Sequence, residues 1–251
     1  MAKKYKILIM GASYGSLLGT KLAMAGHSTH LICLPAEADL MNAEGAIVRM
    51  PIKGREGLVE INSKKLPGKI TAGGTTSANP ADFDLIALAM QEPQYNNHTI
   101  RVLMIKIAAA RLPCLSIMNM PPLPYLKRIP ALAAMDLEDA YTNAGVWDRF
   151  EPGLVSLCSP DPQAFRPPEE KVNVLQVTLP TNFKVARFPA DAHTAILRKL
   201  QDDIEAIRYE VLGTAGADHA RAIRRLDPPR TRTLWHADQE RWHQGRLIFL
   251  V

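Results

Sequence analysis

The residues of this chain best suited to chemistry form a short turn near its start, Gly11-Ala12-Ser13-Tyr14-Gly15-Ser16. The turn follows an apolar run over 6–10 and precedes a run over 17–25 whose apolar residues have helical spacing and which stops at Gly26. A strand–turn–helix of this kind opens the N–H groups and the positive dipole end of a helix to an anion. The pattern therefore predicts that residues 11–16 hold a phosphate or diphosphate group.

The turn differs from the G-x-G-x-x-G fingerprint of dinucleotide-binding proteins. Ser13 stands at the second glycine position, and the spacing from Gly11 to Gly15 is one residue shorter than in the fingerprint. A Cβ at Ser13 would loosen the approach of the backbone to a phosphate. A glycine turn that only joins a strand to a helix is the alternative; the strand that follows at 30–34 favours nucleotide binding.

The end of that second strand should select the cofactor. An acidic residue there binds the ribose hydroxyls of NAD, and an arginine favours the phosphate of NADP. The chain has Leu34-Pro35-Ala36-Glu37, in which Glu37 comes slightly late, and it offers Lys53 and Arg55 as further phosphate partners. The choice between NAD and NADP is open on these residues.

The elements that must position the turn alternate between strands and helices. Apolar runs at 83–90 and 114–118 indicate strands, and 95–112 indicates a helix with one apolar face. This alternation predicts an α/β fold with a mostly parallel sheet and helices on both faces. Residues 154–158, 172–178 and 183–188 are predicted strands, and Asp191 is a predicted N-cap of a helix reaching 209. We expect a dinucleotide-binding domain over 1–190 and a partial helical region over 191–251.

The composition narrows the class of protein. The chain has 251 residues, 47% hydrophobic and 22% charged, and a formal net charge of +5. It has no apolar stretch of membrane-spanning length and no basic stripe with interleaved aromatic residues. We therefore expect a cytoplasmic protein with a small-molecule substrate and neither nucleic acid nor membrane as partner. Cys33, Cys114 and Cys158 lack metal-ligand spacing and are predicted to be reduced structural thiols, with no metal site.

With these residues in view, the chain resembles the ketopantoate reductase (2-dehydropantoate 2-reductase) family. The resemblance lies in K-I-L-I-M-G-A-S-Y-G-S-L-L-G-T-K-L-A-M-A-G-H, in F-D-L-I-A-L-A-M-Q and in L-S-I-M-N-M, and it covers residues 6 to about 120. It implies a Rossmann domain followed by a helical domain, and reduction of a 2-keto acid by NADPH, which favours NADP over NAD. It also implies that Met90 and Gln91 lie beside the ribose and nicotinamide and that Asn119 contacts the substrate.

The chain departs from the family pattern where charge is needed. The family has a lysine at Gln91 and a glycine at Met120, and its catalytic lysine has no match here. Hydride delivery builds negative charge on oxygen, which a cation or acid must stabilise. His98, Lys106 and Lys127 are candidate replacements. A protein that binds or senses a nucleotide without catalysis is the alternative, and another oxidoreductase on the same scaffold is a third interpretation.

The last 42 residues differ in composition from the rest of the chain, with seven arginines and no lysine. They are either a variable cap or sequence foreign to the fold, such as the product of a shifted reading frame. Trp235-His236 and Trp242-His243 repeat at seven-residue spacing, which favours a packing surface over a metal site. A shortened second region would leave apolar surface that a second subunit, in a homodimer, could cover.

Overall fold

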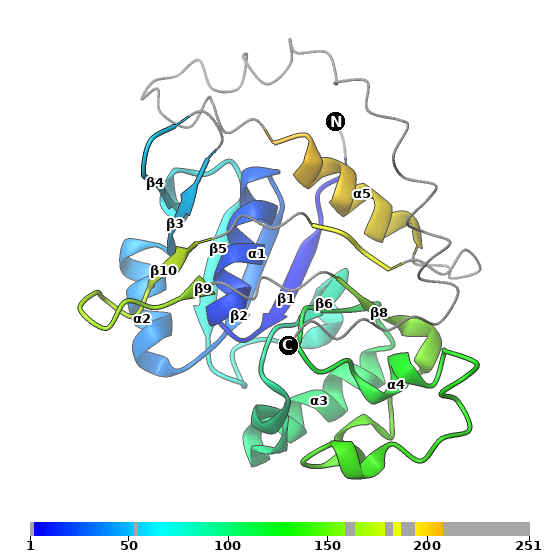
Figure 1. Ribbon diagram of the computed structural model, residues 1–251. Coiled ribbons are helices and arrows are strands. Elements are labelled where there is room, and N and C mark those ends of the chain that lie inside the picture. Colours follow the sequence, from blue (N-terminus) through cyan, green and yellow to red (C-terminus); the bar gives the residue numbers. More distant parts are fainter. Residues whose placement is uncertain (1–2, 53–54, 159–163, 179–182, 187–193, 208–251) are drawn as a thin grey trace. The chain divides into compact units, whose positions relative to one another are not determined.

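A computed structural model describes residues 3–52, 55–158, 164–178, 183–186 and 194–207 of the chain (Figure 1). Lys53, Asp191, the last two residues of the predicted strand at 183–188 and the arginine-rich segment with its Trp-His repeat lie outside these described residues. The expectations for them therefore stay predictions.

Sheet A has six parallel strands in the order β5-β2-β1-β6-β7-β8. The strands are β1 (Lys6–Met10), β2 (Ser28–Ile32), β5 (Lys69–Gly73), β6 (Leu85–Leu88), β7 (Cys114–Ser116) and β8 (Val155–Leu157). The chain builds outward from β1 to β5 and then returns to add β6 on the other side of β1. This is the Rossmann strand order, in which ligands bind beyond the carboxyl ends of the strands where the order reverses. The predicted α/β class is confirmed.

Helices cover both faces of sheet A, as its residue pattern requires. They are α1 (Ser13–Met24), α2 (Pro35–Glu44), α3 (His98–Ala110), α4 (Leu123–Leu126) and α5 (Thr194–Glu205). Ile7 and Ile9 of β1 join a core cluster with α1 and α5, whereas Leu8 and Met10 join a second cluster with α3. Because β1 is buried on both faces, its sequence is continuously apolar rather than alternating.

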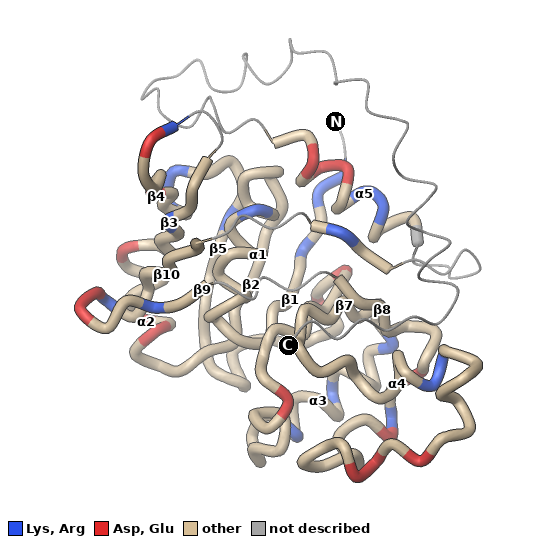
Figure 2. Tube along the Cα trace, in the orientation of Figure 1, with Lys and Arg blue, Asp and Glu red and all other residues tan. Residues whose placement is uncertain are grey.

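The charged side chains are distributed in keeping with this arrangement of a central sheet covered by helices. The charged residues lie mainly on the helices and outer loops (Figure 2), and within the strands of sheet A they are confined to Lys6 and Lys69. Both lysines stand at the first residue of their strand, away from its carboxyl end. The carboxyl edge of the sheet is therefore formed by neutral strand residues.

A second sheet joins segments far apart in the sequence. Sheet B has the order β4-β3-β10-β9, with β3 (Ile47–Pro51), β4 (Leu58–Asn62), β9 (Ala164–Phe165) and β10 (Val174–Val177). β3 pairs antiparallel with β4 and parallel with β10, which pairs antiparallel with β9. Asn173 fixes this junction because its buried Nδ2 donates to the Gly45 carbonyl oxygen at 2.8 Å.

Six short 3₁₀ helices complete the described structure. They are η1 (Ser63–Lys65), η2 (Pro80–Asp82), η3 (Glu92–Asn96), η4 (Glu138–Ala140), η5 (Ala144–Trp147) and η6 (Pro152–Leu154). The ring of Trp147 packs against the rings of Tyr95 and Phe150, with centroid distances of 5.4 Å and 5.6 Å. None of the helices in the described residues is long and apolar enough to cross a membrane.

Several predicted boundaries are wrong. The second strand runs over Ser28–Ile32 rather than 30–34, because Pro35 starts α2, a helix that the sequence analysis did not predict. The segment around 183–188 contributes an isolated bridge, Cys158 to Val185, rather than a strand within its described residues. α5 packs against α1 through Leu197 and Leu200; the predicted domain division at 190 stays a prediction.

Candidate functional site at the carboxyl edge of sheet A

Gly11 brings the turn after β1 against the segment after β6. Its φ is +103°, a conformation that side chains other than glycine rarely adopt. A Cβ at this position would lie 2.9 Å from the Ala89 carbonyl oxygen and 2.9 Å from Cγ of Met90. Two independent constraints, the backbone angle and the close approach, therefore require glycine here.

Gly15 brings α1 close to the sheet. A Cβ at this position would lie 2.8 Å from Cγ2 of Ile9, which is fully buried in β1. Close helix–strand packing is the role of the third glycine in the dinucleotide fingerprint. Gly15 has this packing role one residue earlier in the turn than the third glycine of the fingerprint. The shortened spacing is therefore compatible with the same strand–turn–helix.

The first turn of α1 is open to an anion. Ala12 is the N-cap, it has no side-chain capping hydrogen bond, and the first helical turn holds no acidic residue. Ser13 is exposed and Tyr14 is half-buried. Ser16 is buried, and both its hydroxyl and its backbone amide donate to the Ala12 carbonyl oxygen, so neither group is free for a ligand. The helix dipole and the leading amides thus favour a negative group at this end.

The segment after β6 is held in place by a buried tyrosine. The Ala89 amide donates to the Met10 carbonyl oxygen at 2.9 Å, which continues the pairing of β1 and β6 beyond the strand ends. The Met90 amide donates to the Tyr95 hydroxyl at 3.3 Å. Burial raises the pKa of Tyr95 well above its usual value, so this hydroxyl stays neutral. Gln91 is exposed, and its backbone amide donates to Oε1 of Gln94 at 2.8 Å.

Asn119 lies beyond the carboxyl end of β7, one strand further from the turn. The Ile117 amide donates to the Leu88 carbonyl oxygen at 3.0 Å, and the Met118 amide donates to Oγ of Ser116 at 3.2 Å. These bonds set the path of the chain up to Asn119, whose side chain is exposed. The structure brings Gly11, Met90 and Gln91 to the carboxyl edge of sheet A. Asn119 lies at the same edge, after β7, the strand that pairs with β6.

The end of β2 holds an ion pair that sequence reasoning missed. Oε2 of Glu37 accepts a hydrogen bond from the Leu34 amide at 3.1 Å, so this carboxylate folds back to the strand end. Oε1 of Glu37 pairs with Nη1 of Arg166, which follows β9 in sheet B. Nothing in the local sequence around Arg166 signals this contact, because 129 residues separate the partners. Burial and the charge of Glu37 raise the pKa of the neighbouring Cys33 thiol to about 11, so this thiol is not a nucleophile at neutral pH.

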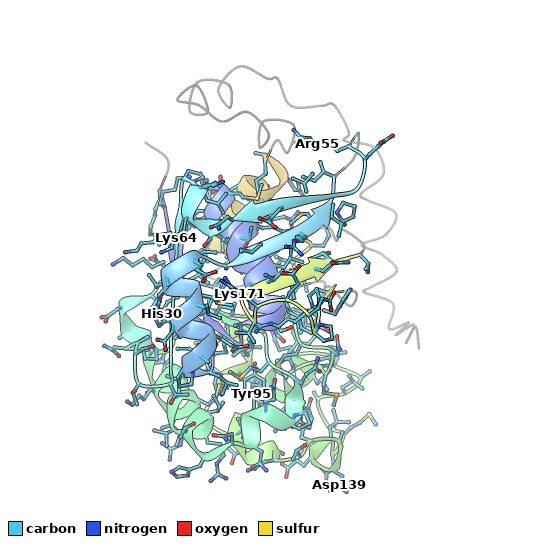
Figure 3. All side chains as sticks on the ribbon, turned by 90° about the vertical axis from the view of Figure 1, so that its left-hand side faces the viewer. His30, Arg55, Lys64, Tyr95, Asp139 and Lys171 are labelled. Atoms are coloured by element: carbon cyan, nitrogen blue, oxygen red, sulfur yellow. The ribbon has the colours of Figure 1, made fainter. Side chains whose placement is uncertain are left out.

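The candidate replacement cations have exposed side chains. His98, Lys106 and Lys127 are exposed, and His98 lines a cavity of about 370 Å³ between α3 and residues 143–149. Arg55 lies at the tip of the hairpin between β3 and β4, far from Tyr95 (Figure 3).

The cysteines carry no metal or disulfide chemistry in this arrangement. Cys33, Cys114 and Cys158 are free thiols. Within the described residues, no group of three or more histidine, cysteine or acidic side chains could hold a metal ion.

Comparison with known proteins gives a structural likeness without a sequence match. No protein-family model matches the chain, and no curated protein matches its sequence. A crystal structure assigned as a ketopantoate reductase from Ralstonia solanacearum MolK2 superposes with a TM-score of 0.56 at 17% identity, over 80% of this chain and 59% of that chain. 2-Dehydropantoate 2-reductase from Methylococcus capsulatus gives a TM-score of 0.49 at 14% identity, over 79% of this chain and 54% of that chain.

The resemblance stated from the sequence is confirmed at the level of the fold, which this chain shares with ketopantoate reductases. The chain spans less than two thirds of the length of the proteins it matches. Likeness at this identity shows the fold alone, so the chemistry of the site has to be argued from the residues themselves.

Proposed function

We propose that this protein binds a nicotinamide dinucleotide across the carboxyl edge of sheet A and reduces a small 2-keto acid or a related carbonyl compound. One observation carries the proposal: the uncapped N-terminus of α1 lies where the strand order reverses, and Gly11 brings it against the loop after β6. This is the position at which Rossmann folds hold a diphosphate.

The described residues fit such a cofactor. Gly11 lets the turn lie directly against Ala89, and the first helical turn holds no acidic side chain that would repel an anion. The amides of Ala12, Ser13, Tyr14 and Gly15 would hold the diphosphate, because those of Gly11 and Ser16 donate to the Ile32 and Ala12 carbonyl oxygens. Met90 and Gln91 would lie beside the nicotinamide ribose. The cofactor, NADP or NAD, supplies a hydride when bound. The Asn119 amide is suited to donate a hydrogen bond to the substrate oxygen on which negative charge builds.

The test places a charge at the mouth of α1. Ser13→Asp adds a carboxylate to an exposed position of the first turn, where it stabilises the helix through its dipole and repels a diphosphate. We expect calorimetry to give a Kd for NADPH and for NADH that is roughly tenfold or more weaker in this variant. Ala109→Asp, at an exposed position of α3, is the matched control. Equal affinities of Ser13→Asp and the unchanged protein would remove the turn from the site.

A second candidate function is nucleotide binding without turnover. It is favoured by Gln91, an exposed neutral side chain at the position where the resemblance implies a lysine. Loss of nicotinamide absorbance with a panel of 2-keto acids separates the two functions. Steady oxidation of the cofactor supports the reductase, and tight binding without oxidation supports the binding protein. A cytoplasmic location belongs to the same proposal.

A further inference from the structure

The cavity of about 370 Å³ between α3 and the segment 143–149 has no residue in common with the carboxyl-edge site. None of the residues that line it belongs to the turn 11–16 or to the segments that hold Met90 and Asn119. Its volume falls within the usual range for sites that bind small molecules. Among the described residues, the lining includes no acidic side chain; the basic side chains are His98, Arg101 and Arg149, and the exposed or half-buried apolar ones include Val102, Ile105 and Val146.

The residues of α3 that line the cavity are ordered along the helix. They share one face because they stand at i, i+3, i+4 and i+7, as His98, Arg101, Val102 and Ile105. The basic pair comes first, near the positive end of the helix dipole, and the apolar pair follows toward the middle of the helix. Val102 and Ile105 are 44% and 48% exposed, so they leave apolar surface open along the cavity. This wall is therefore basic at one end and apolar at the other.

The opposite wall of the cavity is held in place by hydrogen bonds to η3. The Thr142 amide and hydroxyl donate to the two carboxylate oxygens of Glu92 at 3.0 and 2.7 Å. Nδ2 of Asn143 donates to Oδ1 of Asn96 at 2.8 Å. Trp147 of η5 is buried, which anchors the same segment in the core. The cavity is therefore formed without a ligand, and the Glu92 carboxylate near it is already bound to Thr142.

The two guanidinium groups of the cavity are available to an anion. Arg101 and Arg149 are both exposed, and within the part of the chain that the structure describes neither has an ion pair or a side-chain hydrogen bond. Asp148, which precedes Arg149, does not line the cavity. A guanidinium presents several N–H donors in a plane, a geometry that matches a carboxylate. Two such groups beside open apolar surface suit a ligand with a charged head and an apolar tail.

We propose that this cavity binds an aliphatic monocarboxylate, with the carboxylate held by Arg101 and Arg149 and the chain lying over Val102 and Ile105. The volume admits about a dozen non-hydrogen atoms, at the roughly 30 Å³ that a water molecule occupies in the liquid. Octanoate, with about ten such atoms, fits this size. A compact anion would leave the apolar wall uncovered, and an uncharged chain would leave the guanidinium groups without an acceptor. The site is independent of the proposed reductase activity.

The experiment measures the binding of octanoate, butyrate and octylamine to the full chain by calorimetry. Each methylene group that leaves water tightens binding by up to about fourfold. Octanoate should therefore bind at least about tenfold more tightly than butyrate, which has the same head group and a shorter chain. Octylamine carries the same chain with a positive charge, so it should not bind at concentrations that saturate the protein with octanoate.

Substitutions in the cavity separate the head from the tail. Arg101→Met and Arg149→Met should each weaken octanoate by roughly tenfold. Lys106→Met is the matched control, because it removes an exposed charge from the same helix without lining the cavity, and it should change the Kd by less than about twofold. Val102→Thr keeps the shape of an exposed side chain and should reduce the preference for octanoate over butyrate.

The position of bound octanoate is checked with Asn119→Ala, at the carboxyl edge of sheet A. This variant should leave the octanoate Kd unchanged; a loss as large as that in Arg149→Met would put the ligand at the carboxyl edge and overturn the inference. Equal affinities for octanoate and butyrate, or no binding of octanoate, would overturn it as well. Urea unfolding of the arginine variants should give unchanged midpoints, because both side chains are exposed and without partners in the described structure.

Discussion

Replacing Gly15 by alanine sets two effects of opposite sign against each other. Alanine is favoured over glycine in a helix interior by about 1 kcal/mol, so Gly15→Ala, at the third residue of α1, gains at most that much. The added Cβ, however, would lie 2.8 Å from Cγ2 of Ile9. This methyl group is attached to the Cβ of a β-branched, fully buried side chain, so it cannot swing away as the end of a flexible chain could. Overpacking a buried contact costs about 1–3 kcal/mol, so we expect a net loss of up to about 2 kcal/mol in the free energy of unfolding.

Gly19→Ala is the matched control on the same helix. Its Cβ would approach Oγ1 of Thr29 to 3.3 Å, a contact that a small shift relieves. Here the helical preference should dominate, so this variant should be as stable as the unchanged protein or up to about 1 kcal/mol more stable. Urea unfolding followed by circular dichroism measures both variants.

The contact with Ile9 can be isolated by a double-mutant cycle. In an Ile9→Ala background the methyl group is gone, so Gly15→Ala should become neutral or stabilising relative to that background. If Gly15→Ala costs the same with and without the Ile9 side chain, or is as stable as Gly19→Ala, then close packing of α1 on β1 is not the reason for this glycine.

Two further predictions concern buried polar groups. His27 is fully buried; its Nδ1 accepts from the Tyr5 amide and its Nε2 contacts Asp203, while burial lowers its pKa below 6.5. The unfolded chain therefore binds a proton that the folded chain does not, so stability should fall as the pH drops below about 6.5. Urea unfolding at several pH values should show a shallower fall for His27→Gln, and equal slopes would contradict the assignment. Tyr95→Phe removes the acceptor of the Met90 amide and should cost about 1 kcal/mol, measured by the same unfolding; an unchanged midpoint would mean that this amide finds another acceptor.

The parts of the fold that the sequence predicted are those governed by local rules. β1 was predicted at its observed bounds, because its apolar run ends abruptly at a glycine that must adopt positive φ. α1 ends as predicted before Gly26, where the His27 amide donates to the Leu22 carbonyl oxygen and the Gly26 amide to Ala23. Both signals lie within a few residues of the element they define.

The parts that the sequence did not predict depend on distant partners or weak patterns. α2 begins at Pro35 and buries only Ala38 and Met41, so it lacks the broad apolar stripe that marks a helix. In the sequence, Glu37 comes slightly after the position expected of a ribose ligand. Only the folded chain shows that its carboxylate turns back to the Leu34 amide at the end of β2. Arg166 carries no local signal, since its role depends on the pairing of a two-residue strand in sheet B.

The parallel junction of β3 with β10 has a consequence for the order of assembly. Asn173 and Gly45, which fix that junction, are 128 residues apart, and β10 follows all six strands of the larger sheet in the chain. During synthesis the hairpin of β3 and β4 must therefore wait with one edge unpaired until β10 emerges. Any shortened version ending before 174 would keep that edge exposed and invite intermolecular strand pairing.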